Sequence, residues 1–288
     1  MDRHILLTVS DDFSSLQAVR FVAGFFATAD YPQLTLLYVA PNPKAGLTEA
    51  EIIQDYGNLT RRETQTKSLA QTALDRAEEL LVNKHFPRAN IHKKITFKQL
   101  GTAKDIIQEG IAGIYDAIAL GRRGLSRLEE LINESVSKQI FTTPMEIPLW
   151  ICRSNEKPAP SVLLCTDGSP ASLRCADHVG FMLANAPEHE ITLLHVDCGT
   201  SPAVPEDALA QARRMLEENG VAGRRIHQKI VKCTSITDTI LNMTRDGAYG
   251  VLATGRTGRG ESRTQHLLGS VSMNLLKQLE STTLWICH

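Results

Sequence analysis

Short apolar runs alternate along the chain with longer stretches in which apolar residues recur every three or four positions. In the second half the runs predict strands at 161–166, 191–196, 225–231, 250–254 and 283–287, and the longer stretches predict helices near 171–184, 205–219, 236–245 and 270–279. Strands that are apolar on both faces are typical of a sheet covered by helices on both sides. The alternation therefore predicts an α/β fold with right-handed crossovers and a parallel sheet.

This pattern occurs twice. Residues 5–10 correspond to 162–167, 34–39 to 191–196 and 149–152 to 284–287, while a longer segment, 41–76, occurs only in the first half. Each unit has the length of an ordinary domain. We therefore expect two tandem, doubly wound, Rossmann-like domains with five parallel strands each, at residues 1–153 and 161–288. The polar, proline-rich segment 154–160 is the expected hinge.

The last apolar run of each unit holds one of the two tryptophans, Trp150 and Trp285. Each run would be an exposed edge of its own sheet, and such edges are normally paired or covered. The matched positions predict that the halves dock through 149–152 and 284–287, with both tryptophans buried. The alternative is that each tryptophan packs only on helices of its own domain.

A glycine-rich loop follows the fourth predicted strand of the second half. It begins with Gly255 and Gly258 and ends with Gly269, Ser270 and Ser272, where a helix is predicted to start. Glycine lets backbone N–H groups approach phosphate oxygens closely, and a helix N-terminus adds unpaired N–H groups and the positive end of a dipole. The loop favours a phosphate site, although ordinary turn chemistry also explains the glycines.

Further candidates lie at neighbouring strand ends. Asp167 ends the first strand, where its carboxylate could accept hydrogen bonds from a ribose or from loop amides, or could cap the next helix. Val196 could wall a base and Arg256 and Arg259 could neutralise phosphate, although strand valines and exposed arginines often have no such role. The nucleotide-binding set that we predict is Cys165, Asp167, Val196, Gly255, Arg256, Gly258, Arg259, Gly260, Gly269, Ser270, Val271 and Ser272.

Catalysis is not indicated by the sequence. It shows no nucleophile–histidine–carboxylate spacing and no metal cluster, and His195 matches Tyr38 in the repeat, which favours a strand-filling role. We therefore assign no catalytic residue and no metal ligand. Hydrolysis, if it occurs, would be slow and would depend on positioning alone.

Composition excludes several classes of function. With 31 basic and 32 acidic residues and a formal net charge of −1, the chain is not expected to bind nucleic acid by bulk electrostatics. No apolar run approaches the length of a membrane span, and Met1 leads directly into a strand without a signal peptide, so a cytoplasmic location is expected. None of the six cysteines has C-x-x-C spacing, and we expect reduced thiols rather than metal ligands or disulfides.

Together these residues resemble the universal stress protein family over nearly the whole chain. The family pattern is Gly, two residues, Gly, nine residues, then Gly followed by Ser or Thr, with an aspartate closing the first strand. The second half supplies Asp167, Gly255, Gly258, Gly269 and Ser270, with one extra residue between the second and third glycines. That insertion is expected to reshape the phosphate loop.

The resemblance implies a fold of the adenine nucleotide alpha hydrolase-like type and ATP, with or without Mg²⁺, as the ligand. It also implies that tandem halves pack like a dimer through their last strands. The function implied is an ATP-binding sensor or regulator of a stress response, rather than a fast enzyme. The alternatives are a protein-interaction module that binds no nucleotide and a slow ATPase or autokinase. A homodimer and an unidentified protein partner also remain open.

The first half departs from the family pattern. Ser10 stands where Asp167 stands, and Glu134 stands where Gly269 stands. The retained positions are Gly121, Gly124, Ser135 and Ser137. A glutamate adds like charge and a side chain where backbone must approach phosphate, so we expect one ATP per chain, in the second half.

The extra segment, 41–76, is polar and charged around residues 55–63. It predicts an extended loop leading into a helix with Leu69, Ala73 and Leu80 on one face. A solvated loop and helix is favoured over a lid or an interface.

Overall fold

The computed structural model describes residues 2–11, 16–26, 31–121, 147–153, 157–199, 205–245, 248–258 and 268–288. The strands of the first half are β1 (His4–Thr8), β2 (Gln33–Ala40), β3 (Ile91–Phe97), β4 (Ala117–Leu120) and β5 (Leu149–Ile151). The strands of the second half are β6 (Ser161–Cys165), β7 (Glu190–Asp197), β8 (Ile226–Lys232), β9 (Val251–Gly255) and β10 (Thr283–Cys287).

Helices connect these strands. In the first half they are α1 (Gln17–Phe25), α2 (Glu49–Gln54), α3 (Tyr56–Asn83), η2 (Arg88–Asn90) and α4 (Thr102–Ala112). In the second half they are α6 (Pro170–Leu183), α7 (Pro205–Glu218), η4 (Gly223–Arg225), α8 (Ile236–Thr244) and α9 (Ser270–Gln278).

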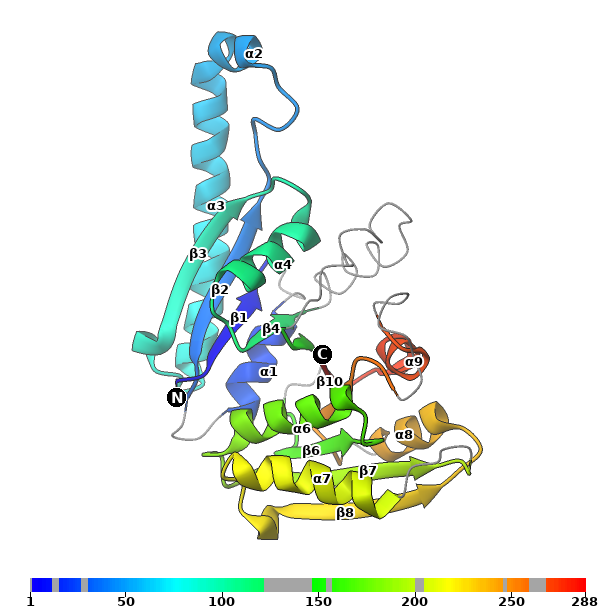
Figure 1. Ribbon diagram of the computed structural model, residues 1–288. Helices are drawn as coiled ribbons and strands as arrows, with labels where there is room; N and C mark the ends of the chain where they lie inside the picture. Colours follow the sequence, from blue (N-terminus) through cyan, green and yellow to red (C-terminus); the bar gives the residue numbers. More distant parts are fainter. Residues whose placement is uncertain are drawn as a thin grey trace.

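All ten strands form one sheet in the order β3-β2-β1-β4-β5-β10-β9-β6-β7-β8 (Figure 1). Every neighbouring pair is parallel except β5 and β10, which are antiparallel. Each half therefore has the doubly wound five-stranded parallel sheet predicted from the repeat, and the fold-class prediction is confirmed. The hinge segment, 154–160, is described only from residue 157 onward.

Two hydrophobic layers run through both halves, one on each face of the sheet. One layer contains the buried faces of α1, α3, α6 and α7, and the other contains those of α4, α8 and α9. The strand β9, like β4, is buried along its whole length. Helices on both faces explain why these strands are continuously apolar in the sequence.

The halves meet at the β5–β10 pair, as the matched tryptophans predict. Trp285 lies opposite Trp150 in the ladder, and their rings stack with centroids 4.1 Å apart and planes at 4°. Both rings are fully buried. Arg3 Nη1 donates to the Met182 carbonyl at 2.5 Å, which ties the first strand to a helix of the second half.

The segment that occurs only in the first half differs from its prediction. The helix α3 begins at Tyr56, so most of the charged stretch 55–63 is helical, and α2 and α3 project beyond the sheet as an arm (Figure 1). Leu69 is not on the buried face, since 60% of it is exposed, whereas Ala73, Leu74 and Leu81 are buried. Leu80 is partly buried and packs against the same hydrophobic layer, so the predicted face is wrong at Leu69 but not at Ala73 or Leu80.

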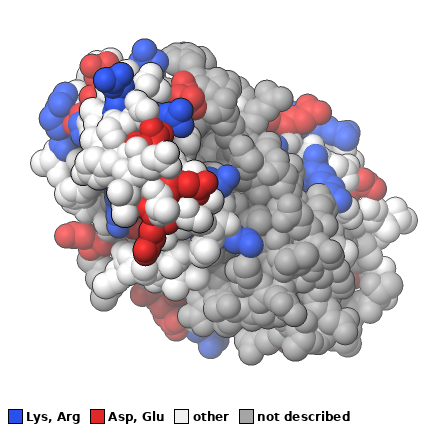
Figure 2. All heavy atoms as spheres, turned by 90° about the horizontal axis from the view of Figure 1, so that it is seen from above, with Lys and Arg blue, Asp and Glu red and all other residues white. Residues whose placement is uncertain are grey.

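Charged side chains on this end of the molecule are mixed in sign. Figure 2 shows Lys and Arg side chains interspersed with Asp and Glu rather than gathered in one patch of the described surface. Lys93 contacts both Asp75 and Glu78 across α3 and β3. This arrangement agrees with the net charge of −1. Among the described residues, no helix combines the length and apolar character needed to cross a membrane.

Candidate functional site

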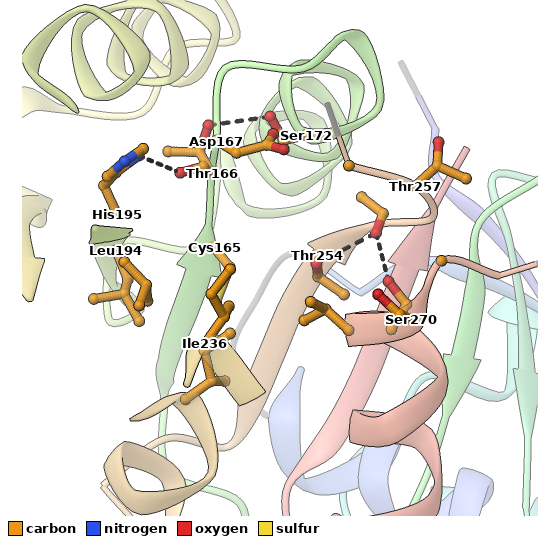
Figure 3. Close-up of a pocket in the computed structure, with 17 residues that line it drawn as sticks. Cys165, Thr166, Asp167, Ser172, Leu194, His195, Ile236, Thr254, Thr257 and Ser270 are labelled. Atoms are coloured by element: carbon orange, nitrogen blue, oxygen red, sulfur yellow. Dashed lines mark hydrogen bonds between the residues drawn. The ribbon is translucent and has the colours of Figure 1, made fainter. Parts of the chain in front are cut away.

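A cavity of about 380 Å³ lies beyond the carboxyl ends of β6, β7 and β9, at the N-terminus of α9 (Figure 3). This is the place where ligands bind in open parallel sheets. The predicted site residues that line it are Cys165, Asp167, Val196, Gly255, Gly258, Gly269, Ser270, Val271 and Ser272. The structure thus brings together residues from three strands and a helix, although their binding of a nucleotide stays a prediction.

The loop after β6 is held in shape by its own side chains. Asp167 Oδ1 accepts a hydrogen bond from the Ser169 N–H at 2.9 Å, and Gly168 adopts a φ of +73°, which favours glycine. Ser169 caps α6 by accepting a hydrogen bond from the Ser172 N–H at 3.2 Å, with Pro170 in the first turn. Asp167 therefore accepts from a loop amide and also borders the cavity.

Gly255 is required by packing. A Cβ at this position would lie 2.7 Å from backbone atoms of Ala171 and Ser172, at the start of α6. A Cβ at Gly258 would meet only Asp167 Oδ2, at 3.3 Å. The two glycines of the predicted loop therefore have different roles: Gly255 permits close approach of β9 and α6, and Gly258 keeps space beside the carboxylate.

The N-terminus of α9 faces the cavity. Its N-cap residue is Gly269, which has no side chain that could cap the helix. Ser272 Oγ donates a hydrogen bond to the Gly255 carbonyl at 2.9 Å, which fastens the helix to the end of β9. The N-terminus of a helix, with its backbone N–H groups and the positive end of its dipole, is suited to bind an anion.

The opposite wall of the cavity is apolar. Cys165, Leu194, Val196, Ile236 and Ile240 line it. Burial raises the pKa of the Cys165 thiol to about 12, so it remains protonated and behaves as a small apolar group. The sequence prediction missed Leu194 and both isoleucines. The spacing of the isoleucines, one helical turn apart at the start of α8, is the signal that could have found them.

His195 is a strand-filling residue, as predicted. It is buried, and its Nδ1 is 2.9 Å from the Thr166 carbonyl (Figure 3). Because a carbonyl only accepts hydrogen bonds, Nδ1 carries the proton. The histidine thus links the end of β7 to the end of β6.

Arg256 does not line the cavity, and Arg259 and Gly260 lie outside the described residues. The backbone of Arg256 joins three elements, since its N–H donates to the Cys287 carbonyl at 2.6 Å and its carbonyl accepts from the Gly269 N–H at 2.9 Å. Burial lowers the pKa of its guanidinium. The geometry assigns Arg256 to holding the loop against β10.

One prediction about the cysteines is wrong. Cys198 and Cys233 form a disulfide between the loops that follow β7 and β8, with Cα atoms 5.0 Å apart. The sequence could not reveal this pair, because the residues come together only when β7 and β8 are adjacent and in register. The remaining cysteines, Cys152, Cys165, Cys175 and Cys287, are buried free thiols. Within the described part of the chain, no group of three or more His, Cys, Asp or Glu residues could hold a metal.

The corresponding region of the first half is only partly described. Ser10 follows β1 at the place that Asp167 occupies after β6, and Gly121 follows β4. Gly124, Glu134, Ser135 and Ser137 lie outside the described residues. The expectation that the first half binds no ATP therefore stays a prediction.

The second half of the chain matches the model of a known protein family. The model of the universal stress protein family matches residues 160–286. A solved universal stress protein in complex with cAMP is 23% identical, with 44% of this chain and 95% of that chain covered and a TM-score of 0.36. A functionally unknown protein from Pseudomonas aeruginosa PAO1 is 14% identical, with 99% of this chain and 92% of that chain covered and a TM-score of 0.50. Among curated proteins the comparison found no match.

Proposed function

Because residues 160–286 match the model of the universal stress protein family, we propose that the second half of the chain binds ATP and that the protein acts as a nucleotide-dependent sensor or regulator. The observation that carries this proposal is the cavity itself. It joins an apolar wall, suited to a purine, to a glycine loop and the N-terminus of α9, suited to phosphate.

Each part of the nucleotide has a place in this proposal. The base packs against Val196, Ile236 and Ile240, and the phosphates lie against the first turn of α9. Asp167, at the end of β6 between these two parts, is the proposed acceptor for a ribose hydroxyl. Mg²⁺ binds through one or two carboxylates together with substrate phosphates, and Asp167 is the carboxylate on the described lining.

Binding rather than fast catalysis fits the chemistry of the described lining. Its titratable side chains are Cys165, Asp167 and His195. The thiol is protonated, the carboxylate accepts from a loop amide, and the imidazole is tied to a backbone carbonyl. None of these is arranged as a base that activates a nucleophile.

Calorimetric titration of the purified full chain with ATP, ADP, AMP and adenosine tests the proposal. We expect ATP to bind with a stoichiometry near one, and affinity to fall as phosphates are removed. A stoichiometry near two would contradict the restriction to the second half. Equal affinity for ATP and adenosine would show that the α9 N-terminus does not bind phosphate. Mass spectrometry of molecules released by heating identifies any nucleotide that is carried through purification.

A further inference from the structure

We propose that Cys198 and Cys233 form a reversible thiol–disulfide switch that controls the affinity of the adjacent cavity for its nucleotide. This inference rests on the proposed function and concerns the regulation of the same site. The pair lies next to the cavity in sequence, since Cys198 is two residues after Val196 and Cys233 is three residues before Ile236, and both of those residues line the cavity.

The pair extends the ladder between β7 and β8 by one step. The last paired residues of the two strands are Asp197 and Lys232, and the cysteines follow them directly. The Cys233 N–H donates to the Asp197 carbonyl at 3.0 Å, so the backbones remain in register at this point. Reduction would therefore leave the two sulfur atoms close to each other, ready to re-form the bond.

The disulfide lies on the same face of the sheet as the cavity wall. Side chains alternate between faces along a strand, so Cys198 shares a face with Val196, and Cys233 shares a face with Val231. Both valines pack against the hydrophobic layer that contains α8 and α9. Val196 also lines the cavity. The disulfide therefore continues this wall outward toward solvent.

The bond also anchors the start of α8. Only Thr234 and Ser235 separate Cys233 from Ile236, the first residue of that helix, which lines the cavity although 38% of it is exposed. Three of the nine residues of α8 are buried, whereas α6, with fourteen residues, buries nine. A helix with so little buried surface is held weakly by packing, so a covalent tie near its N-terminus limits its motion.

Chemical access favours this pair over the other thiols. Cys198 and Cys233 are half-buried, whereas Cys152, Cys165, Cys175 and Cys287 are buried. The internal repeat supplies a comparison, because Pro41 and Lys98 follow β2 and β3 at the matching positions. The cysteine pair is thus confined to the half with the family's glycine loop, as expected if it serves that site.

The switch needs an oxidant, and a low-molecular-weight disulfide supplies it. The thiolate of one cysteine attacks a sulfur of that disulfide, which forms a mixed disulfide and releases one thiolate. The second cysteine then attacks the protein sulfur of the mixed disulfide and releases the other thiolate. The protein loses two electrons and two protons, which appear as two small thiols, and a reducing dithiol reverses the reaction.

The test compares oxidised and reduced full-length protein in ATP titrations, with the redox state verified by mass. We expect reduction to weaken ATP binding about five- to tenfold, because ordering α8 then costs the backbone freedom of about one residue. Reoxidation with glutathione disulfide should restore the affinity. The variant Cys198→Ser should bind like the reduced protein in both conditions, and Cys175→Ser should keep the redox response.

A second readout separates the possible failures. Hydrogen exchange of residues 234–244, measured without nucleotide, should be faster in the reduced protein and in Cys198→Ser. ATP binding with equal affinity in both redox states would overturn the switch while leaving the proposed function in place. Unchanged exchange of α8 would overturn the anchoring mechanism. If neither the oxidised nor the reduced protein binds ATP, and the redox state changes only the hydrogen exchange of residues 234–244, both the proposed function and the control of affinity are overturned.

Discussion

At the scale of single residues, Gly255 and Gly258 offer a matched pair of substitutions. Gly255→Ala would place a Cβ 2.7 Å from the backbone of α6, so β9 or α6 must shift. We expect this variant to lose about 2 kcal/mol of unfolding free energy, as overpacked core positions do. Gly258→Ala meets only a carboxylate oxygen, and its unfolding free energy should change by less than about 0.5 kcal/mol. Urea denaturation measures both, and equal losses would contradict this assignment.

His178 makes the stability of the protein sensitive to acid. Burial lowers the pKa of His178 from 6.5 to about 3, and its Nε2 accepts from Trp150 Nε1 at 3.1 Å, which requires the neutral ring. Below pH 6.5 the unfolded chain binds a proton that the folded protein excludes. The contribution of His178 to the unfolding free energy should therefore fall by about 2 kcal/mol as the pH is lowered from 7 to 5.

The variant His178→Gln isolates that contribution, because glutamine can still accept from the indole but does not titrate. Urea denaturation at pH 7 and pH 5 should show a smaller loss in the variant than in the original protein. Other buried histidines, such as His189, titrate equally in both proteins and cancel in the comparison. An identical loss in the two proteins would show that His178 does not cause the acid sensitivity.

At the scale of elements, the N-terminus of α9 is the part of the site that a single substitution can test. Gly269→Glu copies the residue of the first half, Glu134, into the N-cap position. A carboxylate there would compete with phosphate for the same N–H groups, so ATP affinity should fall by about a hundredfold or more. Asn274→Glu, on the exposed side of the same helix, adds the same charge and should bind ATP normally. Similar ATP affinities for both variants would show that phosphate does not bind at this helix end.

The elements also show where prediction from sequence succeeds and where it stops. The strands β6, β7, β9 and β10 were predictable because burial on both faces leaves a continuous apolar run. The face of α3 was predicted only in part, because the buried position next to Leu69 is taken by a small residue, Ala70, and the larger Leu69 is exposed. The disulfide between Cys198 and Cys233 was missed for another reason. The pairing of these cysteines depends on which strands become neighbours, and local patterns do not contain that information.

At the scale of the whole molecule, the β5–β10 pair makes one sheet out of two repeats. Burial of Trp150 against Trp285 couples the halves, so one half should not unfold while the other remains intact. Trp285→Lys places a charge in this fully buried interface, where no water can solvate it. We expect the variant to lose the coupling and to show two separate thermal transitions in place of one.

The matched control is Trp285→Phe, which keeps an apolar ring against Trp150 and introduces no charge. It should melt in a single transition at a lower midpoint, because the smaller ring leaves a cavity. Calorimetry shows whether each variant unfolds in one transition or in two. The effect of ATP on the midpoints gives a second criterion. If ATP binds only the second half, saturating ATP should raise the midpoint of one transition of Trp285→Lys and leave the other unchanged. A single transition of Trp285→Lys at the original midpoint would mean that the halves are not held together through this strand pair.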